Sequence, residues 1–445
     1  MQWQDEYKKK LVTAEEAVKH IKSHDRVVLG HATGEPQTLI DAMVKNASNY
    51  QDVEIVHKVA MGPCEYCKEE YRDHFRHNSF FLGGSTRESV NGGWADYTPI
   101  FFHEMPEFIR SRYRPDVTML MVSPPDAHGY CSLGVSVDYT KAATECSKVI
   151  IAEVNPQMPR THGDCFIHVN DLDYIVESDT PLIDLFPPKL SDVERAIGSN
   201  VASLLRDGDC LQLGIGAIPD AVLAGLGELN DLGLHTEMFS DGAVTLLDEG
   251  KINNKKKNFN PGKSVATFLM GSRKLYDYVD DNPAVMMMPV DYVNDPRIAC
   301  QNDNLVAINS CVQIDMMGQV VSDSVGLRQI SGVGGQVDFV RAATMSKGGR
   351  AIIAMPSTSR GTVSKIVPFI NEGAAVTTSR FDVDYVVTEI GVTRLKGKTL
   401  RQRAISLTEI AHPDFRDILK EEYQKRFLEP YPTATAAEIQ LKLNI

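Results

Sequence analysis

Residues 209–223 read DCLQLGIGAIPDAVL, and this stretch sets the pattern of the whole chain. A short apolar run, CLQLG, is followed by the turn-forming stretch IGAIP and then by a helical pattern that begins DAVLAGL. Glycine permits a tight turn with close backbone approach, and Pro219 suits the first turn of a helix. The stretch therefore predicts a buried strand over 210–214, a glycine-containing turn, and a helix that starts near residue 220.

The same order of segments occurs 184 residues earlier, in DRVVLGHATGEPQTL at 25–39. A helix is predicted before each copy. The first begins with a capping box formed by Thr13 and Glu16, and the second covers 196–208. A repeat of this length indicates two related halves of the chain. Identical residues fall in register across the two copies: Asp25 and Asp209, Leu29 and Leu213, Gly30 and Gly214, and Leu39 and Leu223.

Further short apolar runs occur in both halves, at 116–122, 148–154, 351–355 and 384–390. Runs this short and this apolar are typical of parallel strands that are covered on both faces. The sequence therefore predicts an α/β protein with two related open domains and largely parallel sheets, arising from an internal duplication. The Pro-Pro pair at 187–188 should stop regular structure, so we expect domains at 1–187 and 188–445.

Composition restricts the class of partner. The chain has 445 residues and a formal charge of −13, which argues against nucleic acid because phosphate binding needs a basic surface. A small anionic ligand is still allowed, since a local pocket can be positive on an acidic protein. The basic run at 255–257 is interpreted as a solvated loop. The eight cysteines, including the closely spaced Cys64 and Cys67, are interpreted as ordinary reduced thiols.

The amino-terminal stretch MQWQDEYKKK has no apolar segment typical of a signal peptide. No apolar run in the sequence approaches the ~20 residues that a membrane span needs. We therefore expect a cytoplasmic protein without membrane contact. A homodimer or higher homo-oligomer is the expected assembly, because most soluble oligomers are symmetric homo-oligomers.

Three stretches could carry chemistry. The turn with Gly214 and Gly216 could hold an anion on its backbone N–H groups, although a tight connection without a ligand fits equally well. Glu237 follows the strand-like run LGLHTEM, so it should lie at a strand end, where ligand crevices form in α/β proteins; an exposed surface glutamate is the alternative. The stretch ISGVGGQVDFV at 330–340 could direct N–H groups at a developing oxyanion, or it could be a flexible loop.

Five motifs occur in a fixed order: LQLGIGAIPDAV, HTEMFSDG, GQVVSDSVG, QISGVGGQVDFVRAA and SKIVP. In this order they resemble the class I CoA-transferase family, and most of all its branch of 4-hydroxybutyrate CoA-transferases and acetyl-CoA hydrolases/transferases. The resemblance runs over nearly the whole chain, from EEAVKHIKSHDRV to VVTEIGVTRLKGKTL. An ordered set of motifs is far more specific than any single glycine-rich turn.

The resemblance implies that Glu237 is a nucleophile and that coenzyme A is both a substrate and part of a covalent intermediate. No metal or other prosthetic group is implied. Gln212 and His31 fall where the two strand-ending turns should converge on Glu237, and His31 could orient the substrate carboxylate or carry a proton. Lys365 could also be an ordinary surface lysine. The resemblance places CoA contacts at Gly214, Ile215, Gly216, Ala217, Ile218, Val312, Gly334, Gly335 and Lys365.

The expected activity is therefore CoA transfer between a short acyl-CoA, 4-hydroxybutyryl-CoA or butyryl-CoA, and acetate, with ping-pong kinetics. An acyl-CoA hydrolase that shares the glutamate is one alternative, and a non-catalytic CoA or metabolite sensor is another. A dinucleotide oxidoreductase is disfavoured, because Ala217–Pro219 stand where the G-x-G-x-x-G pattern requires its third glycine.

Overall fold

The structure is a computed structural model that describes residues 3–186, 188–214 and 216–433. Its first half is built on a seven-stranded parallel sheet in the order β4-β3-β2-β1-β5-β7-β9. Strand β5 is buried along its whole length, as expected for a parallel strand between two layers of helices. The strands are β1 (Arg26–Leu29), β2 (Val53–His57), β3 (Phe75–Ser79), β4 (Asp96–Tyr97), β5 (Val117–Val122), β7 (Val149–Val154) and β9 (Tyr174–Glu177).

The second half is built on a six-stranded sheet in the order β11-β10-β16-β21-β25-β26, in which only the last pair is antiparallel. Strands β11-β10-β16-β21-β25 follow the same spatial and chain order as β2-β1-β5-β7-β9 of the first sheet. The predicted α/β class with two related, largely parallel domains is confirmed. The strands are β10 (Cys210–Leu213), β11 (Gly233–Leu234), β16 (Leu305–Asn309), β21 (Arg350–Ala354), β25 (Tyr385–Val387) and β26 (Val392–Arg394).

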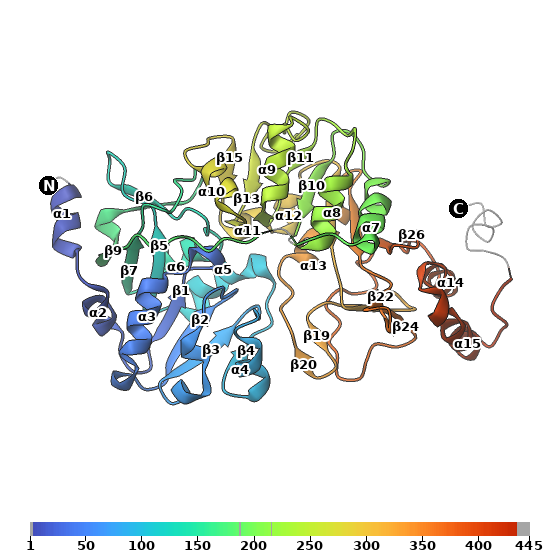
Figure 1. Ribbon diagram of the computed structural model, residues 1–445, viewed down its shortest axis with the longest axis horizontal. Helices are drawn as coiled ribbons and strands as arrows, with labels where there is room; N and C mark the ends of the chain where they lie inside the picture. The colour runs from blue at the N-terminus through green and yellow to red at the C-terminus, as the bar shows by residue number, and fades with distance from the viewer. Residues whose placement is uncertain (1–2, 187, 215, 434–445) are drawn as a thin grey trace.

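Helices cover both sheets, and the two halves lie side by side along the long axis of the molecule (Figure 1). In the first half the α-helices are α1 (Trp3–Lys10), α2 (Ala14–Ala17), α3 (Gln37–Lys45), α4 (Arg87–Gly92), α5 (Met105–Phe108) and α6 (Thr140–Cys146). In the second half they are α7 (Asp192–Ala202), α8 (Ala217–Gly225), α9 (Asp241–Asp248), α10 (Arg273–Val279), α11 (Val290–Val293), α12 (Pro296–Ala299), α13 (Gln336–Met345), α14 (Leu400–Ile410) and α15 (Arg416–Phe427).

The duplicated turn before the first strand of each half has the same hydrogen bonds. The Asp25 carboxylate accepts from the Lys22 N–H at 2.8 Å, and the Asp209 carboxylate accepts from the Arg206 N–H at 2.7 Å. The predicted capping box at Thr13 is also present, with reciprocal bonds to Glu16. Local sequence therefore builds both copies in the same way.

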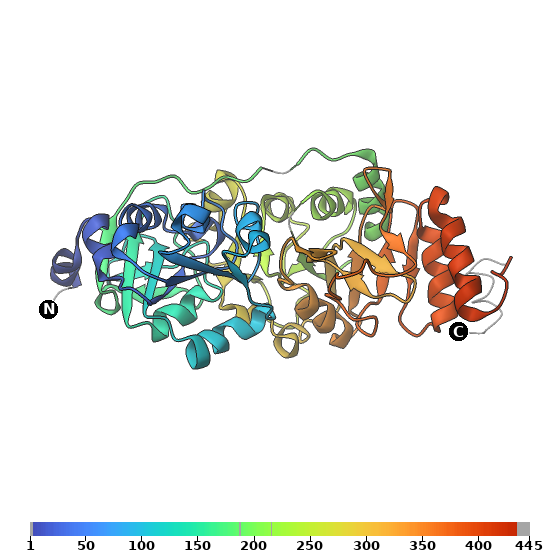
Figure 2. The same ribbon diagram turned by 90° about the horizontal axis from the view of Figure 1, so that it is seen from below.

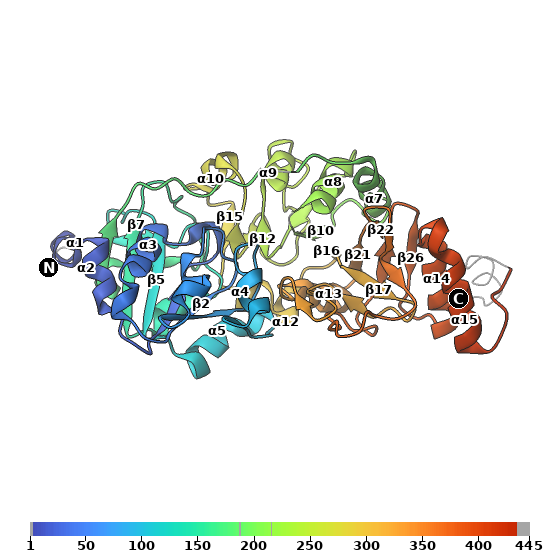
Figure 3. The same ribbon diagram turned by 60° about the horizontal axis from the view of Figure 1, so that its bottom comes forward.

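A segment of the second half packs onto the first half and joins the two. It contains β12 (Met238–Phe239), β13 (Ser264–Ala266), β14 (Phe268–Leu269) and β15 (Val285–Met287). Backbone hydrogen bonds connect this segment to the first half. The Leu269 N–H donates to the Val135 carbonyl at 2.8 Å, and the Met287 N–H donates to the His162 carbonyl at 2.7 Å. In Figures 1 and 3, β15 lies between the two large sheets.

One hydrophobic core runs through both halves and includes Leu120 and Val154 of the first and Leu211 and Val306 of the second. A strap, residues 178–186 and 188–191, lies between β9 and α7 along the outside of the molecule (Figure 2). The domain boundary predicted after residue 187 falls at a residue outside the described ones, and it stays a prediction.

The basic run at 255–257 corrects one expectation. Lys255 and Lys256 are exposed, but Lys257 is buried, and its Nζ donates to the carbonyls of Leu234 at 2.9 Å and Lys263 at 2.7 Å. The prediction of a fully solvated loop is therefore wrong for its third residue. Charge alone does not reveal whether a long aliphatic stem packs under a neighbouring strand.

All eight cysteines are free thiols, and six of them are buried.

Candidate active site

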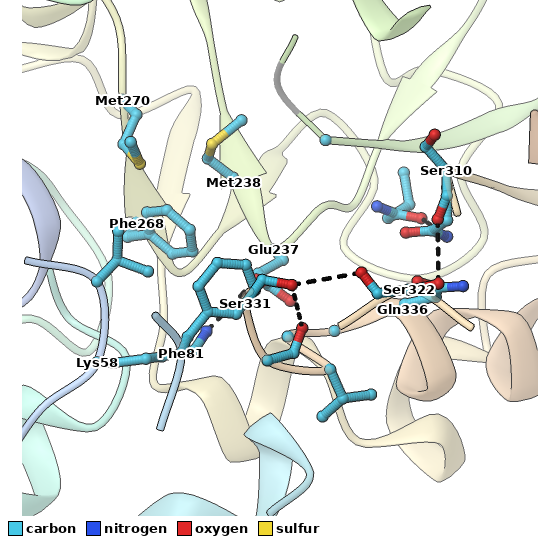
Figure 4. Close-up of a pocket in the computed structure, with 18 of the residues that line it drawn as sticks. Lys58, Phe81, Glu237, Met238, Phe268, Met270, Ser310, Ser322, Ser331 and Gln336 are labelled. Atoms are coloured by element: carbon cyan, nitrogen blue, oxygen red, sulfur yellow. Dashed lines mark hydrogen bonds and ion pairs between the residues drawn. The ribbon is translucent and has the colours of Figure 1, made fainter. Parts of the chain in front are cut away.

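A cavity of about 290 Å³ lies where the two halves meet, and Figure 4 shows its side chains. Lys58 and Phe81 line it from the first half, and Glu237, Phe268 and the loop 331–336 line it from the second. Of the described residues that line it, Glu237 is the one acidic side chain and Lys58 the one basic side chain. A pair of opposite charges thus faces a space that neither half could enclose alone.

The backbone around Glu237 fixes its side chain in the cavity. The residue lies between β11 and β12, and its carbonyl accepts from the Thr267 N–H at 3.0 Å and the Phe268 N–H at 3.2 Å. Its side chain is only 15% exposed. The alternative of an exposed surface glutamate is therefore wrong.

Two neighbours contact the Glu237 carboxylate. The Asn294 side-chain N–H donates to Oε2 at 2.7 Å, and the Lys58 Nζ lies 3.7 Å from Oε1. Burial raises the pKa of the Glu237 carboxyl above its ordinary value, while the Lys58 charge and the Asn294 hydrogen bond act against that rise. The result is a carboxylate that is partly removed from water and still has partners that favour its ionised form.

Lys58 directly follows β2 and is almost completely buried, with 3% of its side chain exposed. Its Nζ lies 2.9 Å from the centre of the Phe102 ring, an aromatic face that attracts a cation. Burial lowers the pKa of Lys58 to about 8, and the charges of Glu237, Asp138 and Asp338 oppose the fall. The neighbouring carboxylates therefore help this buried side chain to keep its charge.

Asn294 is itself held in place by a second carboxylate. Its amide N–H also lies 3.4 Å from Oδ2 of Asp338, whose Oδ1 is 2.7 Å from the His103 ring Nδ1. Burial alone would lower the pKa of His103, but the hydrogen bond and charge of Asp338 outweigh burial and raise it. A protonated His103 would donate to Asp338 and so direct the amide N–H groups of Asn294, rather than its oxygen, toward Glu237.

The glycine-rich loop closes over the same carboxylate. Gly334 has φ +54°, a left-handed conformation that favours glycine, and Gly335 immediately precedes α13. A Cβ on Gly335 would lie 1.7 Å from Oε2 of Glu237 and 2.5 Å from Nδ2 of Asn294. No side chain fits there, so backbone and the amino-terminal end of a helix approach the carboxylate directly.

The structure brings together some of the residues predicted from the sequence. Gln212 accepts a hydrogen bond from Asn309 at 3.1 Å at the cavity wall. Gly216 lines an adjoining cavity of about 150 Å³ that shares Met270 with the first. Ala217 and Ile218 begin α8, and Ile215 lies outside the described residues. The predicted residues that line the main cavity are Gln212, Gly214, Glu237, Gly334 and Gly335.

Val312 and Lys365 are not among the residues that line either cavity. The Val312 N–H donates to the Val321 carbonyl at 2.8 Å, beside Ser322 in the cavity wall. Lys365 is half-buried, burial lowers its pKa, and its carbonyl accepts from the Ile314 N–H at 2.8 Å. Their contacts with CoA stay predictions.

His31 does not line the cavity but lies one layer behind it. The ring is fully buried, its Nδ1 is 3.0 Å from Asp138, and its centre is 4.7 Å from that of the Phe268 ring. Burial lowers the pKa of His31, and the charge and hydrogen bond of Asp138 oppose that fall. A role in carrying protons stays a prediction, and its contact with Phe268 points to support of the cavity wall.

Sequence reasoning missed Lys58, Asn294, Asp338 and His103. The sequence position of Lys58 could have indicated a site residue, because Lys58 directly follows an apolar strand of the first half and ligand sites form at strand ends. Asn294, 57 residues from Glu237, offered none. Within residues 3–186, 188–214 and 216–433, no group of three potential metal ligands occurs, and none of the helices combines the length and apolarity of a membrane span.

Comparison with known proteins gives one consistent family. Residues 1–187 match the acetyl-CoA hydrolase/transferase N-terminal domain, and residues 271–423 match the C-terminal domain of the same family. The chain is 61% identical over 429 residues to 4-hydroxybutyrate coenzyme A transferase of Clostridium kluyveri, with 96% of this chain and 100% of that protein covered.

It is also 38% identical over 437 residues to butyryl-CoA:acetate CoA-transferase of Anaerostipes caccae, covering 96% of this chain and 98% of the relative. Among solved structures, RipA from Yersinia pestis superimposes with a TM-score of 0.93 at 39% identity, over 96% of this chain and 100% of that one.

Proposed function

The chain belongs to the acetyl-CoA hydrolase/transferase family and is an acyl-CoA:carboxylate CoA-transferase, and from this premise we propose its substrates and its covalent mechanism. CoA passes between a short acyl-CoA, 4-hydroxybutyryl-CoA or butyryl-CoA, and acetate. The reaction proceeds through a glutamyl-CoA thioester on Glu237. The observation that carries this proposal is the placement of the Glu237 carboxylate, at 15% exposure, against Asn294 in the cavity between the halves.

The reaction needs covalent catalysis because a carboxylate is a weak nucleophile and the exchange cannot occur in one easy step. A Glu237 oxygen attacks the acyl-CoA carbonyl, a C–O bond forms, and the C–S bond breaks to release CoA thiolate. The thiolate then attacks the glutamyl carbonyl of the mixed anhydride, and the first acid leaves as its carboxylate. The second acid runs the same two steps in reverse, so protons and electrons balance without a metal or redox cofactor in the equation.

The environment of Glu237 suits this role. Partial burial removes water that would otherwise solvate the attacking oxygen, and it also protects the anhydride from hydrolysis. Lys58 and Asn294 stabilise the ionised form that must attack. Oxyanions formed at either carbonyl would be stabilised by N–H groups around Gly334 and Gly335, the loop that approaches the carboxylate without a side chain.

The walls of the cavity suggest how substrates lie. Met238, Phe268 and Met270 form an apolar side, while Ser310, Ser322 and Gln336 lie on the opposite side of Glu237 (Figure 4). We place the acyl chain, of about four carbons, against the apolar side and the pantetheine arm of CoA along the polar side. The CoA contacts proposed for Gly214, Val312 and Lys365 extend outward from that polar side, and those proposed for Gly216, Ala217 and Ile218 lie at the start of α8, beside the adjoining cavity.

Trapping of the intermediate tests the mechanism. The protein is incubated with butyryl-CoA without an acceptor acid and reduced with borohydride, and the modified peptide is located by mass spectrometry. We expect a reduced glutamyl side chain at Glu237 that is absent from Glu237→Ala. An unmodified Glu237 with butyryl-CoA intact would refute the substrate, and release of CoA with no trapped adduct would favour an acyl-CoA hydrolase.

The ratio of transfer to hydrolysis in the presence of acetate separates the transferase from the hydrolase directly. The cytoplasmic location and the homo-oligomeric state expected from the sequence are parts of this proposal. Light scattering of the purified protein tests the oligomeric state.

A further inference from the structure

Lys58 has a charge environment that depends on the chemical state of Glu237. Its side chain is 3% exposed, and the nearest carboxylate oxygen, Oε1 of Glu237, is 3.7 Å from its Nζ. Three aromatic rings also lie near the ammonium group, with centres 2.9 Å away in Phe102, 5.6 Å away in Phe81 and 5.8 Å away in Phe268. Asp138 and Asp338 act on Lys58 through their charges only. Glu237 is therefore the one carboxylate in ion-pair range among the described residues that line the cavity.

Formation of the thioester removes that partner. When Glu237 is bonded to CoA sulfur, its carboxylate charge is gone, and Lys58 is left as a buried cation without an ion-pair partner in the cavity. A buried charge that loses its partner is strongly destabilised. A carboxylate that enters the cavity and lies beside Nζ would restore the pairing at the position where the second acid must attack.

We propose that Lys58 is the binding site for the carboxylate of the acid substrate when the enzyme is in its glutamyl-CoA form. This inference rests on the proposed function and adds to it the group that captures the acid. The ligand is a short carboxylate anion, held with one oxygen toward Nζ and the other toward the glutamyl carbonyl. Attack forms the C–O bond of the anhydride and breaks the C–S bond, and the negative charge moves from the acid to CoA thiolate.

The pairing also explains selection against water. A neutral molecule interacts with the unpaired ammonium group only through its dipole and a hydrogen bond, whereas an anion gains the stronger charge–charge attraction in a site of low dielectric constant. The aromatic rings around Lys58 exclude solvent and strengthen that attraction. When the second acid has left as its thioester, the Glu237 carboxylate is regenerated and pairs with Lys58 again.

The test compares two reagents that cleave the same thioester. The full-length protein is loaded with butyryl-CoA, freed of excess reagent, and mixed rapidly with either acetate or neutral hydroxylamine. For Lys58→Met we expect the acetate concentration at half-maximal rate to rise about 30-fold or more, the effect of removing one partner of a buried charge pair. Cleavage by hydroxylamine should stay within about threefold of the wild-type rate, because a neutral nucleophile needs no cation.

Lys58→Arg, which keeps the charge, should recover most of the acetate affinity. Lys68→Met, which removes an exposed lysine from the same half, is the matched control and should behave as wild type. If Lys58→Met does not fold, Lys58→Gln takes its place with the same expectation. Unchanged acetate dependence, or an equal fall in both reactions, would overturn the proposal, as would failure of both folded variants to form the thioester. Failure of the wild-type protein itself to form a thioester would instead refute the proposed function.

Discussion

At the scale of single residues, the Glu237 carboxylate is held between a cation and an amide. Lys58 Nζ lies 3.7 Å from Oε1 of Glu237, and Asn294 Nδ2 donates to Oε2 at 2.7 Å. Both neighbours favour the ionised carboxylate, whereas burial disfavours it. The amide is directed by Asp338, which in turn contacts His103. Each neighbour therefore changes how readily Glu237 loses its proton, and this can be measured as a pH dependence.

Asn294→Asp should move the pH dependence of thioester formation upward. The change replaces a donor 2.7 Å from Glu237 with a like charge, which raises the pKa of the Glu237 carboxyl further. Glu237 reacts as an anion, so activity is lost as pH falls through its pKa, and a higher pKa moves that loss to higher pH. We expect a shift of roughly one pH unit or more in the acid limb of the single-turnover rate. Asn294→Ala, which adds no charge, should lower the rate by about 100-fold with a smaller shift.

Gly335→Ala should abolish transfer while the fold survives. The added Cβ would lie 1.7 Å from Oε2 of Glu237, so the carboxylate must leave its position. The expected fall in kcat/KM is at least about 100-fold, as for loss of a positioned catalytic group. Gly84→Ala is the matched control because a Cβ there meets nothing within 4 Å. Equal activity of the two variants would show that the loop does not hold Glu237 in place.

At the scale of elements, the duplicated strand-turn-helix units are alike in their turns and differ in what surrounds them. The carboxylates of Asp25 and Asp209 each accept a hydrogen bond from the backbone N–H of the residue three positions earlier in the chain. Only Asp209 also forms a buried ion pair with Arg350, at the start of β21. The second half therefore has a buried ion pair between the residue that precedes β10 and the first residue of β21, and no such pair is found at Asp25 among the described residues.

Asp209→Asn should destabilise the protein more than Asp25→Asn. Asp209→Asn leaves the buried Arg350 without its charged partner and should lower the free energy of unfolding by about 3 kcal/mol. Asp25→Asn keeps a hydrogen-bond acceptor in a half-exposed turn and should lower it by less than about 1 kcal/mol. Thermal denaturation of the two variants under identical conditions measures the difference. Equal falls in Tm would mean that the ion pair adds nothing beyond the turn.

At the scale of the whole molecule, the two halves are joined by packing and not only by the strap. The shared core and the backbone bonds between 264–294 and the first half hold Glu237 opposite Lys58. The strap at 178–186 and 188–191 passes along the outside (Figure 2), and Phe186 within it is 76% exposed. Integrity of the strap should therefore matter little once the protein has folded.

Cleavage of the folded protein at a protease site inserted after Lys189 should leave an active complex. The two fragments should elute together in size-exclusion chromatography and keep most of the transferase activity, because noncovalent burial between the halves is unchanged. The uncleaved variant is the control. Separation of the fragments, or loss of activity without separation, would show that the strap itself holds the halves in register.

Local sequence patterns were enough to predict the repeated strand-turn-helix units, the α/β class and the position of Glu237 next to a strand. These follow from hydrophobic periodicity, glycine and proline in turns, and capping residues, all of which act within a few positions along the chain. The glycine-rich loop at 330–340 was also visible, although only the structure shows that Gly335 has no room for a side chain beside Glu237.

The side chains that surround Glu237 could not be predicted from the sequence, because the packing of the two halves brings them together. Lys58, Asn294 and His103 come from segments far apart in the chain, and no local pattern connects them to Glu237. The burial of Lys257 was hidden for the same reason, because a charged residue does not reveal which strand will cover its stem. Local chemistry fixes the elements, whereas packing between the two halves decides which charges lose their water and face each other.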